Sequence, residues 1–248
     1  MKRLLKYLAL MVAFATPAAA LDLSAMSDDE KDAFGAAVRE YLMENPELII
    51  EVIQVLEAKR VADEAQTDRE LALAYEDELF NDGYSHISGN ADGDIRIVEF
   101  IDYRCGYCRK AHPEVKEMVE EDGNISVVYK EYPILGEESV IAARIAITTR
   151  NLYGGETYED MQDALMAFSG SLTEAGIRRL ADAVDVDADA ILTTMTMDEI
   201  SNEINRNRVL GNAMAITGTP TFVAEQEMLR GYVPKDQFVS LVDILRKQ

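Results

Sequence analysis

The chain contains two cysteines, Cys105 and Cys108, which are separated by Gly106 and Tyr107. Residues 95–101, just before the pair, form a mostly apolar run that predicts a buried strand, and the residues after the pair predict a helix. A C-x-x-C motif at a strand-to-helix junction is typical of redox chemistry. At the amino end of a helix, free backbone N–H groups and the helix dipole stabilise a thiolate and lower the thiol pKa. We therefore predict that Cys105 is an exposed attacking thiol, and that Cys108, one turn further, is a more buried resolving thiol.

Two thiols can also bind a metal ion. A zinc site needs about four ligands, and His86 and His112 are the only imidazoles in the chain. Cu(I) favours soft ligands, so a copper-binding or chaperone-like scaffold stays open as an alternative. Met195 and Met197 offer two thioethers, although this spacing is more typical of helix packing, and we interpret His112 as a surface or packing residue. We assign no metal-binding residue and no cofactor.

The first residues of the chain have the pattern of a secretory signal peptide. Residues 1–20 contain basic residues, then a short apolar run, then Ala18-Ala19-Ala20. The apolar run is too short to span a bilayer, although an uncleaved anchor is the alternative. We predict cleavage after Ala20 and a periplasmic location.

Charge and cysteine content narrow the function further. The net charge of −22 argues against a nucleic-acid partner, because phosphates require Lys and Arg. In an oxidising compartment, two cysteines commonly form a structural disulfide. Here such a bond would close a loop of two intervening residues and would constrain the unfolded chain little. These features favour a redox role for the pair.

The mature chain is predicted to contain an N-terminal helical segment, 21–82, and a second domain, 83–248. Ser27 and Glu30 form a capping box at the start of the first helix. The segment has too few apolar residues for a core of its own, so we expect its apolar face to be buried by self-association, with docking on the second domain as the alternative. The polar stretch 57–70 would then act as a spacer. The apolar positions of this face include Phe34, Val38, Tyr41, Leu42, Leu48, Ile49, Val52, Ile53, Val55 and Leu56.

The second domain is predicted to be an α/β fold. Its expected elements are a strand at 95–101, a helix, a strand at 125–130, a helical block from about 138 to 215, two short strands within 218–223 and 228–231, and a closing helix at 234–247. The order β-α-β, helical block, β-β-α is that of a thioredoxin fold interrupted by a helical insertion.

Two motifs give the sequence a family resemblance. They are Phe-x-Asp-Tyr-x-Cys-Gly-Tyr-Cys at 100–108 and Gly-Thr-Pro-Thr-Phe at 218–222. With them, the chain resembles the DsbA-like branch of the thioredoxin superfamily. Within that branch it is similar to the suppressor-of-copper-sensitivity C proteins, which carry an extra N-terminal helical segment. The resemblance covers nearly all of the mature chain.

The resemblance implies roles for several residues. Pro220 is expected in the cis form, facing the C-x-x-C motif, and Thr219 is expected to offer its backbone to an extended substrate. Glu99 is expected beneath Cys108, where it relays the proton of that thiol, with Lys130 as its partner. A solvent-facing Glu99 is the alternative, since strand faces alternate. The residues assigned to substrate binding are Thr219, Pro220, Gly106 and Tyr107.

The resemblance also implies a thiol–disulfide oxidoreductase that acts on cysteine-containing secreted proteins and exchanges electrons with a membrane partner. Neutral Tyr107, in a position where a histidine could help stabilise a thiolate, favours a disulfide isomerase or reductase. Thr219 before the proline also resembles the isomerases. A homo-oligomer fits this function, and the resemblance implies three subunits. A DsbA-like dithiol oxidase remains the alternative within the same class.

Overall fold

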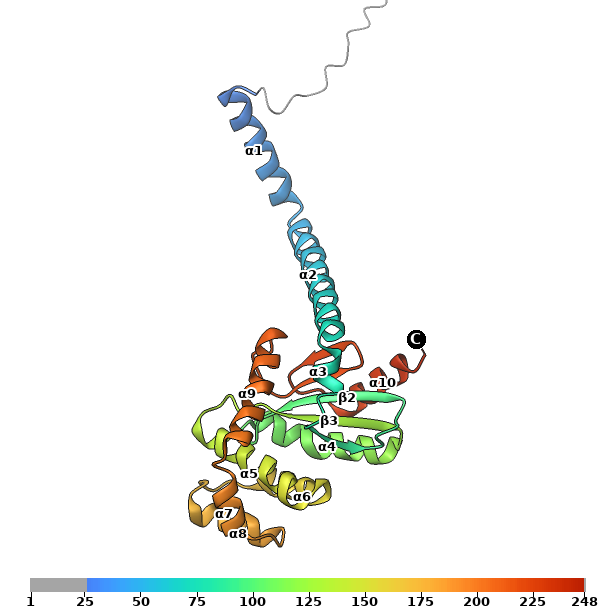
Figure 1. The fold of residues 1–248 in the computed structure, drawn as a ribbon. Coiled ribbons are helices and arrows are strands. Elements are labelled where there is room, and N and C mark those ends of the chain that lie inside the picture. Colours follow the sequence, from blue (N-terminus) through green and yellow to red (C-terminus); the bar gives the residue numbers. More distant parts are fainter. Residues whose placement is uncertain (1–25, 248) are drawn as a thin grey trace, which may run out of the picture. The chain divides into compact units, whose positions relative to one another are not determined.

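The computed structural model describes residues 26–247 (Figure 1). The predicted signal peptide, 1–20, lies outside the described residues. The chain divides into two compact units, with the division between Lys59 and Arg60. Among residues 26–247, no helix combines the length and the apolar character needed to cross a bilayer.

The first unit consists of helix α1 (Asp28–Glu44) and the beginning of α2 (Glu47–Ala74). The predicted capping box is confirmed, because the Ser27 hydroxyl accepts from the Glu30 N–H while the Glu30 carboxylate accepts from the Ser27 N–H at 2.8 Å. Within residues 26–59 no side chain is buried. The apolar side chains that are 41–69% exposed are Phe34, Val38, Tyr41, Met43, Ile49, Ile50, Val52, Ile53, Val55 and Leu56.

The second unit is built on a five-stranded sheet in the order β1-β3-β2-β4-β5. Only β2 and β3 run parallel, and the other neighbours are antiparallel. The sequence predicts the last four strands but misses β1, a short edge strand whose residues are only partly buried. The strands are β1 (His86–Gly89), β2 (Ile95–Ile101), β3 (Ile125–Glu131), β4 (Thr221–Ala224) and β5 (Glu227–Arg230).

The predicted helical insertion is present between β3 and β4. It contains five separate helices rather than one continuous block, so the pattern overestimated its continuity. The helices of the second unit, after α2, are α3 (Glu76–Phe80), α4 (Gly106–Asp122), α5 (Glu137–Tyr153), α6 (Gly155–Ala167), α7 (Glu174–Ala183), α8 (Ala188–Thr194), α9 (Asp198–Ala213) and α10 (Lys235–Leu245).

The two faces of the sheet contact different helices. In β2, Ile97 and Ile101 lie in a cluster with residues of α4, α6 and α10, whereas Val98 and Phe100 lie in a cluster with residues of α3 and α9. This alternation follows from the two-residue period of a strand. Figure 1 shows α4 lying along the sheet next to β3. Since α4 begins a few residues after β2 ends, the sheet fixes the position of the C-x-x-C motif.

Close packing of α9 against the sheet depends on Gly211. A Cβ atom added at Gly211 would lie 2.5–2.8 Å from three atoms of Tyr132, whose side chain is buried and donates a hydrogen bond to the Ile216 carbonyl at 3.0 Å. We therefore expect Gly211→Ala to lower the free energy of unfolding by about 1–3 kcal/mol through overpacking, measured by urea unfolding.

Gly35→Ala is the matched control, because a Cβ atom at this exposed position of α1 meets nothing within 4 Å. This substitution should leave the free energy of unfolding unchanged or raise it slightly, since alanine favours the helix over glycine. An unchanged urea midpoint for Gly211→Ala would contradict the packing described for α9.

Candidate active site

Cys105 is the N-cap residue of α4 and lies against the loop that contains Pro220. Its backbone is extended (φ −77°, ψ 120°), and its carbonyl accepts from the Arg109 N–H at 3.1 Å. The Cys105 thiol donates to the Thr219 carbonyl, with Sγ 3.0 Å from the oxygen. The Thr219–Pro220 peptide bond is cis, which confirms that prediction. The C-x-x-C motif and the proline loop therefore meet at the amino end of α4.

The two thiols differ in accessibility and in proton affinity. The prediction of an exposed Cys105 is wrong in degree: the residue is 8% exposed, because its thiol lies against the Thr219 carbonyl. A hydrogen bond with the Cys108 side chain is the main reason why the pKa of Cys105 falls to about 5, despite the opposing effect of burial. Thr219 and the N–H groups of Cys108 and Tyr107 lower this pKa further.

Cys108 is fully buried, and its pKa is raised. The hydrogen bond to Cys105 has the largest effect, followed by burial and by the negative charge of Glu99. Both cysteines are free thiols in this structure. The geometry thus combines one thiol that ionises readily with a neighbour that retains its proton, which is the asymmetry that thiol–disulfide exchange needs.

Glu99 is buried in β2, so the structure excludes a solvent-facing side chain. Neither carboxylate oxygen has a hydrogen-bond partner among the described residues. Burial raises the pKa of Glu99 to about 8, and the charge of Glu131 contributes to this increase. A buried carboxyl group with such a pKa can gain and lose a proton near neutral pH.

The predicted pairing of Glu99 with Lys130 is wrong. In the parallel pair of strands, Glu99 lies opposite Tyr129, and Lys130 lies opposite Phe100. Because successive side chains alternate between faces, Lys130 points to the other side of the sheet. There its Nζ donates to Asp82 at 2.5 Å and to the Glu78 carbonyl at 2.7 Å.

The buried ion pair changes the acid–base properties of both its members. Burial lowers the pKa of Lys130, and the charge of Asp82 opposes this effect only in part. Burial acts to raise the pKa of Asp82, but the Lys130 ammonium group lowers it overall. Lys130 therefore belongs to the packing of α3 and the loop after it rather than to the site of the two cysteines.

The remaining residues assigned to substrate binding lie at the surface of α4. Gly106 is exposed, and a Cβ atom at this position would meet nothing within 4 Å. Tyr107 is 64% exposed, and its ring stacks on Tyr232 with 6.4 Å between centroids. The Nζ atom of Lys110 lies 4.0 Å from the centre of the same Tyr232 ring. An aromatic and cationic surface thus adjoins the motif.

Sequence reasoning did not single out Asp102, which shapes the backbone beside the motif. This buried carboxylate accepts from the N–H groups of Ile134 and Leu135 at 2.8 and 3.0 Å and from the Arg104 N–H at 2.8 Å. Its position directly after a buried strand was a usable signal, since a carboxylate there often accepts backbone N–H groups. The guanidinium groups of Arg104 and Arg109 both donate to the Phe168 carbonyl.

A second carboxylate, Glu131, was also missed, because the predicted strand ended at Lys130. Glu131 is the last residue of β3 and is buried. One of its oxygens accepts hydrogen bonds from Tyr103 at 2.7 Å and from Tyr158 at 2.8 Å. Tyr103 lies two residues before Cys105, so this buried group borders the motif.

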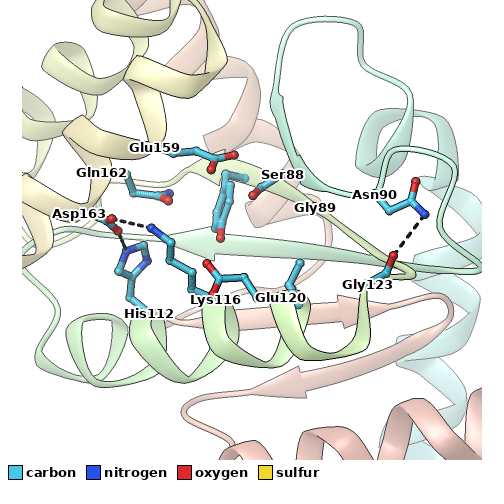
Figure 2. Close-up of a pocket in the computed structure, with 12 residues that line it drawn as sticks. Ser88, Gly89, Asn90, His112, Lys116, Glu120, Gly123, Glu159, Gln162 and Asp163 are labelled. Atoms are coloured by element: carbon cyan, nitrogen blue, oxygen red, sulfur yellow. Dashed lines mark hydrogen bonds and ion pairs between the residues drawn. The ribbon is translucent and has the colours of Figure 1, made fainter.

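A pocket of about 400 Å³ lies between α4, α6 and the β1–β3 edge of the sheet (Figure 2). His112 and Lys116 extend from α4 and both contact Asp163 of α6, at 2.5 and 2.6 Å. His112 is therefore a buried packing residue that shares a hydrogen bond with Asp163, rather than a surface residue. Neither cysteine lines this pocket.

The side chains considered as metal ligands are dispersed. Met195 is buried in the core, whereas Met197 is mostly exposed. Across residues 26–247, no three or more His, Cys, Asp or Glu side chains are grouped in a way that fits a metal ion.

Comparison with known families gives two matches along the chain. Residues 96–243 match the DSBA-like thioredoxin domain, and residues 30–62 match the N-terminal domain of the copper resistance protein ScsC. Neither match reaches residue 82, so the predicted domain boundary at that position stays a prediction.

Solved structures of similar proteins support the same assignment. A thioredoxin-like oxidoreductase from Silicibacter pomeroyi is 40% identical, with 69% of this chain and 98% of that chain covered and a TM-score of 0.65. The thiol-disulfide exchange protein alpha-DsbA2 from Wolbachia pipientis is 26% identical, with coverages of 74% and 98% and a TM-score of 0.69. Proteus mirabilis ScsC in a compact conformation is 28% identical, with coverages of 86% and 97% and a TM-score of 0.64.

Curated relatives include the Na(+)/H(+) antiporter NhaA 1 of Salinispora arenicola, which is 26% identical over 138 residues, or 55% of this chain. The chain spans only 21% of the length of that protein, so the likeness concerns one part of it. The family match to more than half of the chain agrees with the sheet order, the cis-proline loop and the helical insertion. The chain belongs to the DSBA-like thioredoxin domain family and carries an N-terminal segment that matches the N-terminal domain of ScsC.

Proposed function

We propose that the protein exchanges disulfides through Cys105-Gly106-Tyr107-Cys108, with Cys105 as the attacking thiol and Cys108 as the resolving thiol. The main support is the position of the Cys105 sulfur, at the amino end of α4 and 3.0 Å from the carbonyl before the cis-proline. There its pKa is lowered to about 5, chiefly by the hydrogen bond with Cys108. At neutral pH, Cys105 is then a thiolate, which is the nucleophile in this chemistry.

The reaction begins when the Cys105 thiolate attacks one sulfur of a substrate disulfide. A mixed disulfide forms, and the other substrate sulfur leaves as a thiolate. In isomerisation, a different substrate thiolate then attacks the substrate sulfur of the mixed disulfide, which forms a new disulfide within the substrate and releases the Cys105 thiolate. In reduction, Cys108 attacks the Cys105 sulfur, which gives a Cys105–Cys108 disulfide and a reduced substrate, while the Cys108 proton passes to the Glu99 carboxylate.

Substrates are cysteine-containing secreted proteins that bind beside the motif. The backbone at Thr219 and Pro220 borders Cys105 and can pair with an extended segment, as in strand addition. The Thr219 carbonyl accepts from the Cys105 thiol only while that thiol is protonated, so ionisation of Cys105 frees this carbonyl for a substrate N–H group. Exposed Gly106 and Tyr107 form the outer side of the same surface.

Within this class we favour isomerase or reductase activity over outright oxidation. The Cys105 pKa of about 5 lies between the values of about 3.5 and about 7 that are typical of a strong oxidant and of a reductant. The signal-peptide pattern favours the periplasm, where a membrane partner would set the redox state of the pair. An oligomer, with three subunits as the expected number, would present several active sites to one substrate.

The thiolate assignment predicts the pH dependence of alkylation. In the reduced mature chain, Cys105 should react with iodoacetamide along a curve with a midpoint near pH 5, whereas Cys108 should remain unreactive. The pKa of Cys105 is lower in the folded protein than in the unfolded chain. Ionisation of Cys105 therefore stabilises the folded, reduced protein, and this stabilisation is fully present above the pKa of an unfolded cysteine. It is lost as the pH falls through about 5. The Cys105→Ser variant is the control. A wild-type alkylation midpoint at about pH 8.5, the value of an ordinary thiol, would refute the assignment of Cys105 as a thiolate at neutral pH.

The exposed apolar side chains of the first unit predict self-association. We expect the mature chain to sediment as an oligomer, and Ile53→Glu with Leu56→Glu to give a monomer, since charge on an apolar interface is costly. The neighbouring polar position provides the control, Gln54→Glu, which should leave the mass unchanged. A wild-type monomer at micromolar concentration would contradict the proposal.

The same two samples test isomerase activity. Oligomeric wild-type protein should reactivate a scrambled multi-disulfide substrate, and the monomeric variant should do so more slowly while it still oxidises or reduces simple dithiols. If monomer and oligomer reshuffle disulfides equally well, the oligomer has no role in isomerisation. If the wild-type protein only oxidises reduced substrates, the dithiol-oxidase alternative is correct.

A further inference from the structure

Glu131 is a buried carboxylate for which the exchange reaction as described gives no role. It is 1% exposed at the end of β3. Its Oε1 atom accepts from the hydroxyl groups of Tyr103 and Tyr158, while Oε2 has no partner among the described residues. Burial of such a group is costly unless it is compensated or used.

Glu131 and Glu99 lie on the same face of two neighbouring strands. The parallel register pairs Glu99 with Tyr129 and Ile101 with Glu131, so the two glutamates are diagonal neighbours on the face that packs against α4. With about 3.3 Å per residue along a strand and about 4.8 Å between strands, their Cα atoms are separated by about 8 Å. The two carboxyl groups interact in this buried interior, where the charge of Glu131 contributes to the raised pKa of Glu99.

Few groups around Glu99 can compensate a negative charge. The ionisable side chains that face it are Cys108 from α4 and Tyr129 and Glu131 from β3. None of them is a cation, and no hydrogen bond reaches its carboxyl oxygens. Burial, followed by the charge of Glu131, raises the pKa of Glu99 to about 8.

Glu131 is surrounded by groups that can stabilise its anion. Burial raises its pKa to about 8, although the hydrogen bonds from Tyr103 and Tyr158 act in the opposite direction. Arg150 of α5 also favours the anion, but its guanidinium group is already bonded to Glu203 of α9 at 2.7 and 2.8 Å. Glu203 itself opposes ionisation.

We propose that Glu131 is a positioning residue that controls when Glu99 is ionised, because the two carboxyl groups share one buried face and compete for the same proton. In a buried site of low dielectric constant, ionisation of one carboxyl group disfavours ionisation of its neighbour. Since two tyrosine hydroxyls bond to Glu131 and none bonds to Glu99, the first negative charge resides on Glu131 and the last proton on Glu99.

This coupling matters for the resolving step and, in that respect, rests on the proposed function. When the Cys108 thiol attacks the mixed disulfide, the new sulfur–sulfur bond forms, the substrate thiolate leaves, and the Cys108 proton moves to the Glu99 carboxylate. A proton acceptor works best when its pKa lies near the working pH. Burial has the largest effect on the pKa of Glu99, and the charge on Glu131 raises this pKa further toward that range.

Hydrogen bonds connect Glu131 with the lining of a pocket. The Tyr158 hydroxyl, which bonds to Glu131, accepts from the side-chain amide of Gln162 at 3.4 Å. Gln162 lines the pocket in Figure 2, whose volume of about 400 Å³ is enough for several water molecules. Glu131 is thus linked to the lining of this pocket through Tyr158 and Gln162.

The test is a ¹³C NMR titration of the glutamate carboxyl groups in the reduced, full-length mature chain. Glu131→Gln removes the charge but keeps a carbonyl oxygen for the two tyrosines, and we expect the Glu99 ionisation midpoint to fall by about one pH unit or more. Glu120→Gln, which neutralises an exposed carboxylate on α4, is the control and should leave this midpoint unchanged. An unchanged midpoint in Glu131→Gln overturns the proposal.

Tyr158→Phe provides a second variant in case Glu131→Gln does not fold. Loss of one hydrogen bond makes Glu131 a weaker acid, so Glu99 should ionise at lower pH, by less than in Glu131→Gln. An unchanged Glu99 midpoint again overturns the proposal. The pH profile for release of a mixed disulfide should shift in the same direction, a change that a purely structural role would not produce.

The two proposals fail in different ways. The titration is independent of turnover, so a wild-type protein that exchanges no disulfides would refute the proposed function while the carboxyl coupling is still measured. A normal exchange rate with an unmoved Glu99 midpoint would refute only the coupling.

Discussion

The contact between the Cys105 sulfur and the Thr219 carbonyl joins two segments that are 114 residues apart in sequence. The sheet explains this contact. β2 and β4 are antiparallel, with Phe100 opposite Thr221, so the end of β2 and the start of β4 lie side by side. The C-x-x-C motif follows the first strand and Pro220 precedes the second. The long helical insertion therefore does not have to position the motif, because pairing of the two central strands already does.

The same sheet separates two kinds of buried charge. On one face, Lys130 is neutralised by Asp82, and this pair contributes to the packing of α3 and the loop that follows. On the other face, Glu99 and Glu131 are buried without an ion pair to either carboxyl group among the described residues. A buried ion pair costs less than an isolated buried charge, so the second face carries the larger electrostatic penalty. That penalty raises proton affinity next to Cys108, where a proton must be transferred, and we interpret it as functional.

Local patterns in the sequence were sufficient for the fold but not for the contacts between side chains. The apolar run at 95–101 predicts β2 with its observed bounds, because a buried strand has a simple signature. The sequence did not predict β1, because a four-residue edge strand has little apolar pattern. The partner of Lys130 was wrongly assigned because strand register decides which face a side chain occupies, and a single sequence does not reveal register. Glu131 was overlooked for a related reason: its significance arises only when β3 lies beside β2.

The proposed exchange reaction requires the Cys105 sulfur to be the attacking nucleophile. The most direct measurement is trapping of the mixed disulfide in the Cys108→Ser variant with a disulfide-containing peptide, followed by mass spectrometry of the adduct. We predict one peptide per chain, attached at Cys105 and formed readily at pH 7, because the thiolate is already present at that pH. No adduct in Cys108→Ser, together with a stable adduct at Cys108 in the Cys105→Ser variant, would contradict the account.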